Sequence, residues 1–239
     1  MTEITKEQIA NLLKIQSPDG LPKAWLENQE IVAAITGKPL PGVPLAGQKP
    51  RVDNQIDFKD LEAQAKSCTN CVLHQSRKNV VFGTGNLNPD LVFVGEGPSS
   101  EEDLKGKPFF GKASELLAAA IEKGMKLKKE DVYLCNVVKC RPPNNRAPLP
   151  EEIQTCSGYL EKQLKFLNPK VIVALGNPAM KALTKKDEGI TKVRGQWLKW
   201  NDFDVMPTFH PAYILRNPDA KKDFWNDLKL VMTRLGIES

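Results

Sequence analysis

Four short apolar runs constrain the fold of this chain more than any other feature of its sequence. They are continuous rather than alternating, and they lie at Leu91–Val94, Val132–Val138, Val171–Leu175 and Val205–Phe209. Stretches with helical spacing of apolar residues surround them, at Ala113–Lys123, Glu151–Leu167, Pro178–Leu183 and Ala220–Leu235. Strands that are apolar on both faces and alternate with helices are typical of a parallel sheet covered on both sides. The sequence therefore predicts a three-layer α/β/α domain with a central, mainly parallel, four-stranded sheet.

Residues 1–56 differ in character from the rest of the chain. Two short amphipathic stretches, near Glu7–Ile15 and Trp25–Ile35, precede a segment from Gly37 to Pro50 that is rich in proline and glycine. Such a composition is typical of a linker. We therefore expect an N-terminal helical appendage and linker in residues 1–56, followed by the α/β domain in residues 57–239.

The charge of the chain is unevenly distributed. The 239 residues carry a net charge of +5, and nine Lys or Arg face four acidic residues between Gly106 and Pro148. A local basic field attracts a polyanion such as a nucleic acid, although a solvated helix face explains the lysines of residues 123–129 equally well. No apolar run reaches the roughly 18 residues of a membrane span, and the first sixteen residues do not resemble a signal peptide. We expect a cytoplasmic protein without a membrane partner.

Four of the five cysteines form two pairs. Cys68 and Cys71 form a C-x-x-C turn, while Cys140 and Cys156 are separated by fifteen residues, and Cys156 lies on the apolar stripe of a predicted helix. In a cytosolic chain such pairs indicate metal or redox chemistry before disulfides, but their spacing does not separate zinc from a [4Fe–4S] cluster. Cys135 falls inside a predicted strand, so we expect it to be an ordinary buried core residue. Considered by itself, Cys156 could also be a core cysteine rather than a ligand.

Polar residues follow three of the predicted strands at the point where each strand ends. Gly95, Glu96 and Gly97 follow the first, Asn136 lies in the second, and His210 follows the fourth. Ligands of parallel α/β sheets bind at the carboxyl ends of the strands. The sequence therefore predicts a ligand site at this edge.

Six motifs occur in a fixed order between residues 58 and 235. They are Cys68–Cys71, Gly95–Pro98 with Glu102 and Asp103, Gly106–Gly111, Asn136–Pro143, Glu152 with Cys156, and His210–Ala212. Together they resemble the family 4 uracil-DNA glycosylases, the iron–sulfur branch of that superfamily. The resemblance implies a monofunctional enzyme, expected to be monomeric, that removes uracil from single- or double-stranded DNA and leaves an abasic site. It also implies a [4Fe–4S] cluster held by Cys68, Cys71, Cys140 and Cys156.

Two positions depart from the family pattern. Gly97 stands where alanine is usual, and Ser99 where glycine is usual. Both are small, so we expect the turn to survive, but a preference for another deaminated base, hypoxanthine or xanthine, stays open. The resemblance does not cover residues 1–56, which could bind a replication or repair protein. A non-catalytic DNA-binding module is therefore a further alternative.

Three residues are candidates for contacting the base. The resemblance makes Phe109 a stacking surface, with core packing beside Phe110 as its alternative. Burying an amide such as that of Asn136 in an apolar strand is costly unless it is paired. One amide can accept from uracil N3–H and donate to O4, although a turn or cap role is the alternative. His210 can donate to uracil O2 as negative charge builds on the leaving base.

The remaining uracil-site candidates surround these residues. Gly95 and Gly97 form the turn under the base, and Glu96 is the candidate for holding the attacking water or offsetting charge on the sugar. Asn145 is a second candidate for positioning water or the sugar–phosphate. Glu102 is expected near the uracil 5-position, where it would help to exclude thymine, and a carboxylate at a helix N-terminus is its alternative.

The segment from His210 to Arg216 resembles the family's DNA-insertion loop. Ile214 is the predicted apolar wedge, which fills the gap that a flipped nucleotide leaves. Arg216, together with Arg141 and Arg146 of the proline-rich loop, is predicted to hold phosphates.

Overall fold

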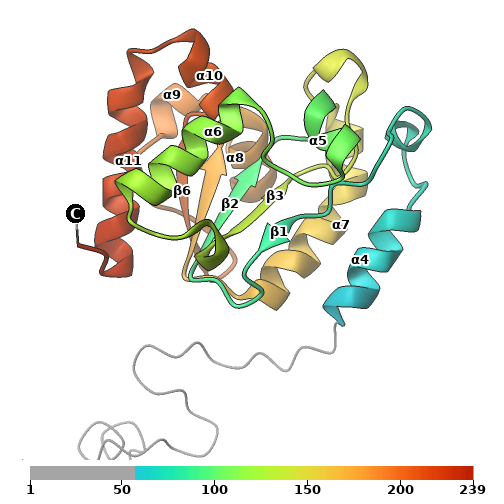
Figure 1. The fold of residues 1–239 in the computed structure, drawn as a ribbon, viewed down its shortest axis with the longest axis horizontal. Coiled ribbons are helices and arrows are strands. Elements are labelled where there is room, and N and C mark those ends of the chain that lie inside the picture. The colour runs from blue at the N-terminus through green and yellow to red at the C-terminus, as the bar shows by residue number, and fades with distance from the viewer. Residues whose placement is uncertain (1–56, 239) are drawn as a thin grey trace, which may run out of the picture. The chain divides into compact units, whose positions relative to one another are not determined.

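A six-stranded sheet runs through residues 57–238, the part of the chain that the computed structural model describes (Figure 1). Its four central strands are parallel, and in spatial order they are β3 (Tyr133–Asn136), β2 (Leu91–Gly95), β4 (Val171–Leu175) and β6 (Phe203–Thr208). The predicted α/β class and its four parallel strands are confirmed. Short antiparallel strands, β1 (Thr84–Gly85) and β5 (Leu198–Trp200), were not predicted and close the two edges. The appendage and linker expected in residues 1–56 lie outside the described residues.

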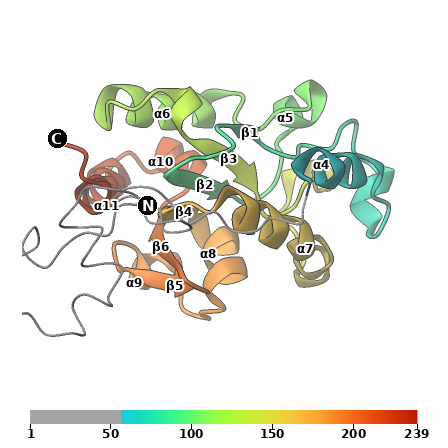
Figure 2. The same ribbon diagram turned by 90° about the horizontal axis from the view of Figure 1, so that it is seen from below.

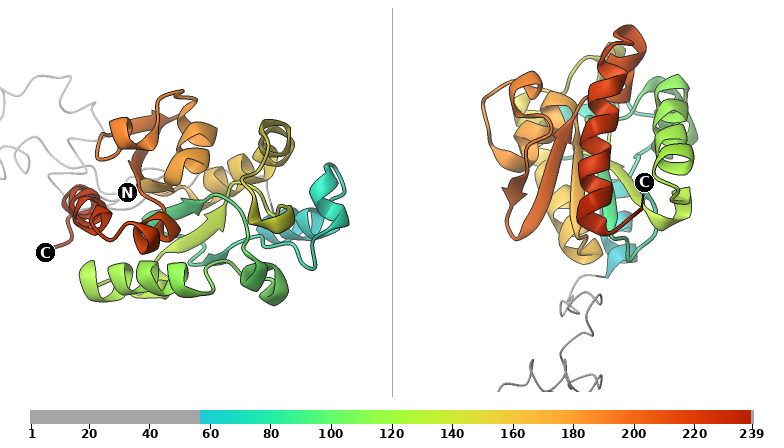
Figure 3. Two further views of the ribbon diagram at one scale, coloured as in Figure 1. Left: turned by 90° about the horizontal axis from the view of Figure 1, so that it is seen from above. Right: turned by 90° about the vertical axis from the view of Figure 1, so that its left-hand side faces the viewer.

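Burial explains why the central strands read as continuous apolar runs. Every residue of β2, β3 and β4 is buried, because helices cover both faces of the sheet. Helix α6 (Lys112–Ala119) lies on one face and α8 (Gly176–Thr184) on the other (Figures 2 and 3). A strand in this position has no solvent side, so it shows no polar alternation.

The other helices flank this core. They are α4 (Phe58–Ser67), α5 (Ser100–Lys105), α7 (Pro150–Leu167), α9 (Ile190–Val193), α10 (Pro211–Arg216) and α11 (Ala220–Leu235). Single turns of 3₁₀- or π-helix occur at Val72–Gln75, Ala120–Gly124, Lys129–Asp131 and Pro143–Asn145. The four predicted helices are present as α6 with its π-turn, α7, α8 and α11. Within residues 57–238, no helix is both long and apolar enough to cross a membrane.

The strand order indicates where along the sheet a ligand can bind. The chain passes from β2 to β3 on one side and then returns past β2 to β4, so the direction of the crossovers reverses next to β2. A reversal of this kind opens a crevice at the carboxyl ends of the strands. Gly176 follows β4 with φ +83°, and a Cβ there would lie 3.2 Å from the Cβ of His210, which follows β6. The absence of a side chain at this position lets the two loops approach each other.

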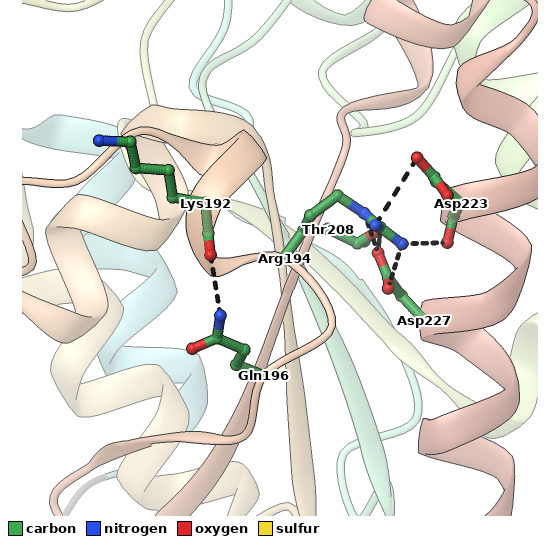
Figure 4. A network of polar contacts seen from close by, with 6 residues as sticks. All are labelled: Lys192, Arg194, Gln196, Thr208, Asp223 and Asp227. Atoms are coloured by element: carbon green, nitrogen blue, oxygen red, sulfur yellow. Dashed lines mark hydrogen bonds and ion pairs between the residues drawn. The ribbon is translucent and has the colours of Figure 1, made fainter.

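A buried ion pair fixes the end of β6 (Figure 4). Arg194 donates from Nη2 to Asp227 Oδ1 at 2.6 Å and from Nε to Asp227 Oδ2 at 3.0 Å. The hydroxyl of Thr208 donates to Asp227 Oδ2 at 2.6 Å, and the Arg194 guanidinium lies 5.4 Å from the centroid of the Phe209 ring. The Asp227 carboxylate therefore joins α11 to the last residues of β6, immediately before His210.

The Arg194→Met variant should lower the free energy of unfolding by about 3 kcal/mol, because it leaves the Asp227 carboxylate buried with only the Thr208 hydroxyl. Urea denaturation measures the change. Lys170→Met is the matched control, since the pair between Lys170 and Asp90 is exposed and its loss should cost less than about 1 kcal/mol. Equal losses in the two variants would contradict a special role for the buried pair.

Candidate active site

A cleft of about 470 Å³ opens at the carboxyl edge of the sheet. Its walls are the turn after β2, the proline-rich loop after β3, and the start of α10 after β6. The volume lies in the range of small-molecule sites, about 300–1,000 Å³. The structure thus brings together three of the segments that the sequence placed at this edge, with Glu96, Asn145, His210 and Arg216 all lining the cleft.

Asn136 ends β3 beside the cleft, and its side chain is buried without full hydrogen bonding. The residue is 4% exposed, and its Nδ2 has no hydrogen-bond partner. A Cβ on Gly95 would come within 2.3 Å of Asn136 Oδ1 and 3.7 Å of Phe109 Cζ, so all three residues are in close proximity. An unpaired buried amide costs about 1–3 kcal/mol, and a ligand that pairs with Nδ2 would recover this cost.

Phe109 adopts a backbone conformation that is unusual for a bulky residue. Its φ is +63°, in the left-handed region, and its side chain is buried. Glu102 stabilises this geometry, because one oxygen of its carboxylate accepts from the Phe109 N–H. The other oxygen accepts from the Ser99 N–H at 2.6 Å in the capping box of α5. Burial raises the pKa of Glu102, whereas the hydrogen bonds from Ser99 and Phe109 lower it.

These contacts clarify two predictions. Glu102 occupies the helix N-terminal position that was its alternative interpretation, and its predicted contact with the uracil 5-position stays a prediction. Ser99, where the family pattern has glycine, accepts from the Glu102 N–H at 3.3 Å and caps α5. The cap explains the presence of a serine at position 99 without any reference to the choice of substrate.

His210 presents a neutral imidazole to the cleft. It is the N-cap of α10, and its Nδ1 accepts from the Ala212 N–H at 3.1 Å, which leaves the hydrogen on Nε2. Burial lowers the pKa of His210 to about 4, with a smaller contribution from the charge of Arg216. The side chain is thus prepared to donate a hydrogen bond from Nε2 without carrying a charge of its own.

Glu96 supplies a carboxyl group to the wall of the same cleft. It follows Gly95 at the end of β2, and burial raises its pKa. Beside it, Gly97 lies against the next strand connection, since a Cβ there would be 2.8 Å from Val138 Cγ2. The space that the usual alanine would need is therefore taken by Val138, and a methyl group at this position would point toward that residue.

The structure corrects the predicted DNA wedge. Ile214 is 2% exposed and packs into the core, so it is not available at the surface. Its neighbours in α10, Tyr213 and Leu215, are 39% and 46% exposed. The predicted exposure of Ile214 is therefore wrong, and the role of the segment from His210 to Arg216 in DNA insertion stays a prediction.

The predicted phosphate contacts also change. Arg146 donates from Nη2 to Glu152 Oε1 at 2.6 Å and from Nη1 to Glu152 Oε2 at 2.8 Å, so its guanidinium is already paired. Arg141 donates from Nε to Asn145 Oδ1 at 2.7 Å. Lys139, one of the nine cations between Gly106 and Pro148, is buried. The basic surface of this region is smaller than the sequence count indicated.

The four cysteines of the two sequence pairs have free thiols and line one small cavity, which shares no lining residue with the cleft. Cys68, Cys71, Cys140 and Cys156 all reach it, whereas Cys135 is buried within β3. Arg77, which sequence reasoning missed, donates from Nη1 to Cys140 Sγ at 3.1 Å. Burial raises the pKa of both Cys140 and Cys156, that of Cys156 to about 11.

The chemistry of these four side chains fits the implied cluster. Four thiols around one cavity are the donor set of a [4Fe–4S] cluster, and tetrahedral zinc accepts the same four thiolates. Among residues 57–238, no three His, Cys, Asp or Glu side chains are already arranged around a single metal ion. The choice between the two groups is made by metal content.

Comparison with known proteins agrees with this fold. Residues 82–229 match the family model described as the uracil DNA glycosylase superfamily, and the chain belongs to this superfamily. The match spans the central sheet, the cleft and Asn136, as well as two of the four paired cysteines.

The relatives narrow the assignment to one branch. The chain is 52% identical to the type-4 uracil-DNA glycosylase of Thermotoga maritima, over 66% of this chain and 82% of that protein. It is 41% identical to the type-4 enzyme of Saccharolobus solfataricus, over 75% and 88% of the two proteins. A type-5 enzyme of Pyrobaculum aerophilum is 33% identical over 54% and 63%. These matches confirm the family 4 resemblance that the six motifs indicated.

The ring protons of His210 should titrate with a midpoint near pH 4 in an NMR experiment. An ordinary imidazole gains its proton around pH 6.5, whereas burial should keep His210 neutral through that range and charge it only as the pH falls toward 4. The chain has two histidines, so the resonance missing from His210→Gln identifies the site. A midpoint at or above 6.5 would contradict the neutral donor.

Proposed function

We propose that this protein is a uracil-DNA glycosylase that extrudes deoxyuridine from DNA and hydrolyses its N-glycosidic bond. The observation that carries the proposal is the unpaired, buried Nδ2 of Asn136, beside the ring of Phe109. A base inside a duplex cannot reach such a group, so the nucleotide has to leave the stack. The relatives named above support the same activity through their names. All the residues invoked lie in residues 57–239, which we assign as the catalytic domain.

The Asn136 amide reads the edge of the base in this proposal. Its Nδ2 donates to uracil O4, and its Oδ1 accepts from uracil N3–H. Cytosine presents an acceptor at N3 and a donor at position 4, so it meets the amide with both bonds reversed. The Phe109 ring stacks on the base, and Gly95 leaves the base room to approach because it carries no side chain. Binding uracil thus satisfies the amide that the free protein leaves unpaired.

His210 and Glu96 act on the bond itself. As the bond between N1 and C1′ lengthens, negative charge develops on the uracil and positive charge on the sugar. His210 donates from Nε2 to O2, which stabilises the departing anion, and a single preorganised donor of this kind is worth about 10²–10³ in rate. Glu96 holds water for attack on C1′, with Asn145 as a second positioning group. Water supplies the hydroxyl on C1′ and the proton that uracil gains.

Uracil is favoured over hypoxanthine or xanthine as the substrate. The two departures from the family pattern left that question open, and both have local explanations in the fold. The position of a methyl group on residue 97 faces Val138, and Ser99 caps α5. Neither change enlarges the space around Asn136.

The DNA contacts lie around the mouth of the cleft. Leu215 and Tyr213 are the exposed apolar side chains of α10, and we assign the wedge role to Leu215. Arg216 lines the cleft and Arg141 lies on the adjacent loop, so both can contact phosphates. Single- or double-stranded DNA that contains uracil is thus the proposed partner. A role of residues 1–56 in binding a replication or repair protein is part of the same proposal.

A [4Fe–4S] cluster held by Cys68, Cys71, Cys140 and Cys156 is the proposed cofactor. The four thiolates would each hold one iron, and the bound cluster would then tie α7, the loop after β3 and the C-x-x-C segment to one another. Two of these segments continue directly into the walls of the cleft. The cysteines therefore stabilise the loop that carries Arg141 and Asn145.

The activity is tested by base release from single-stranded oligonucleotides that contain uracil, hypoxanthine or thymine. We expect release of uracil alone. His210→Ala and Asn136→Ala should each lower the rate by about 10²-fold or more, since each removes a donor to the base. Asn88→Ala, at an exposed position in the loop before β2, is the matched control and should keep full activity.

Three outcomes would contradict this assignment. Salt-sensitive DNA binding without base release would indicate a non-catalytic module. Faster release of hypoxanthine would indicate the alternative substrate class. Full activity in both site variants would contradict the site rather than the function.

The cofactor is tested by colour and metal content. Purified protein should be brown, with broad absorbance near ~400 nm and about four iron atoms per chain. Cys156→Ala should lose iron, whereas Cys135→Ala should keep it, because Cys135 does not reach the cavity. A colourless protein with stoichiometric zinc would contradict the cluster.

A further inference from the structure

Lys139 is a buried lysine that lies between the cysteine cavity and the base-reading amide. It is 2% exposed, it lines the cysteine cavity, and it immediately precedes Cys140. Its Nζ donates to the main-chain oxygen of Asn136 at 2.7 Å. A lysine on a DNA-binding surface would be exposed to solvent, and its ammonium group would not donate to the main chain of a buried strand. The buried side chain of Lys139 therefore needs a different explanation.

The main chain of Lys139 makes two further connections. Its carbonyl accepts from the Val81 N–H at 2.8 Å, and its peptide bond joins it to Cys140, a proposed cluster ligand. One residue thus connects a proposed cluster ligand, the end of β3 and the segment before β1. A change at the cysteine cavity has a short covalent and hydrogen-bonded route to Asn136.

The surroundings of the ammonium group contain thiols rather than carboxylates. Of the ion pairs among residues 57–238, none includes Lys139. The groups that face it are the thiols of Cys135, Cys140 and Cys156, and the Phe82 ring lies 5.9 Å away. A buried ammonium without a counter-ion is strongly unfavourable. A cluster ligated by four thiolates is a net anion, and it supplies the missing charge.

We propose that Lys139 is a positioning residue that couples the iron–sulfur cluster to uracil recognition. The cluster holds the ammonium group by charge, and the ammonium group fixes the main chain of Asn136, whose side chain reads the base. This inference rests on the cluster and the uracil site proposed above. It gives the cluster a role in substrate binding through one identifiable side chain.

The test compares Lys139→Met with Arg77→Gln, each purified with its cluster and normalised to iron content. Lys139→Met removes a charge near the cluster and the bond to Asn136. Arg77→Gln removes a charge and the bond to Cys140 Sγ, but the side-chain hydrogen bonds of Arg77 go to Cys140 and Lys66, and none goes to Asn136. The readouts are the reduction potential of the cluster and the KM and kcat of uracil release from a single-stranded oligonucleotide.

We expect both variants to shift the reduction potential to more negative values, because each removes a positive charge beside an anionic cluster. Only Lys139→Met should raise KM, by about tenfold, with a smaller change in kcat. A wild-type KM in Lys139→Met would overturn the proposal. An equal rise of KM in Arg77→Gln would overturn it as well, since binding would then follow any disturbance of the cluster.

Lys139→Arg decides the question if the methionine variant does not fold. It keeps the charge but cannot place an ammonium group at the Asn136 oxygen, so the potential should stay near that of the wild type while KM rises severalfold. An unchanged KM would overturn the proposal. If wild-type protein releases no uracil, the proposed function itself fails, and that result is separate from any variant.

Discussion

The register of β2 against β3 is the constraint on which the candidate site depends. The two parallel strands align Gly95 with Asn136, and main-chain hydrogen bonds continue past the strands, from Val137 N to Gly95 O at 3.0 Å and from Val138 N to Glu96 O at 3.2 Å. This register brings the amide against the one residue of β2 that has no side chain. A shift by a single residue would place Val94 or Glu96 there instead. The pocket for the base is therefore a property of strand pairing before it is a property of any side chain.

The His210 side of the cleft is supported by a second set of contacts, which does not involve β2 or β3. His210 caps α10, and the strand that precedes it is held by Thr208, Asp227 and Arg194, which belong to β6, α11 and the segment after α9. The Asn136 side is held by Lys139 and the cysteine cavity. The two side chains that hydrogen-bond to the base in the proposed reaction thus rest on separate polar networks. Damage to either network should leave the opposite wall of the cleft intact.

Much of the architecture could be predicted from the sequence, and the limits have physical reasons. Buried parallel strands leave a strong signal, whereas β1, with two residues, is too short to show a pattern. The ligand edge and the paired cysteines followed from strand ends and spacing. The face of α10 that meets solvent depends on how that helix packs against α6, so the sequence alone did not show that Ile214 is buried and Leu215 exposed. The pairing of Arg146 with Glu152 and the burial of Lys139 are likewise tertiary facts, although the position of Lys139 beside Cys140 was a signal that could have been used.

Phe109 combines a strained backbone with a buried aromatic ring. A left-handed backbone costs a bulky residue about 1–2 kcal/mol, and glycine would adopt it freely. Loss of a buried Phe side chain costs more, about 3–5 kcal/mol, so the ring stays and the Glu102 carboxylate holds the main chain. A ring that is needed for the core is also one that cannot easily turn away, so the same burial that tolerates the strain would keep the proposed stacking surface in one orientation.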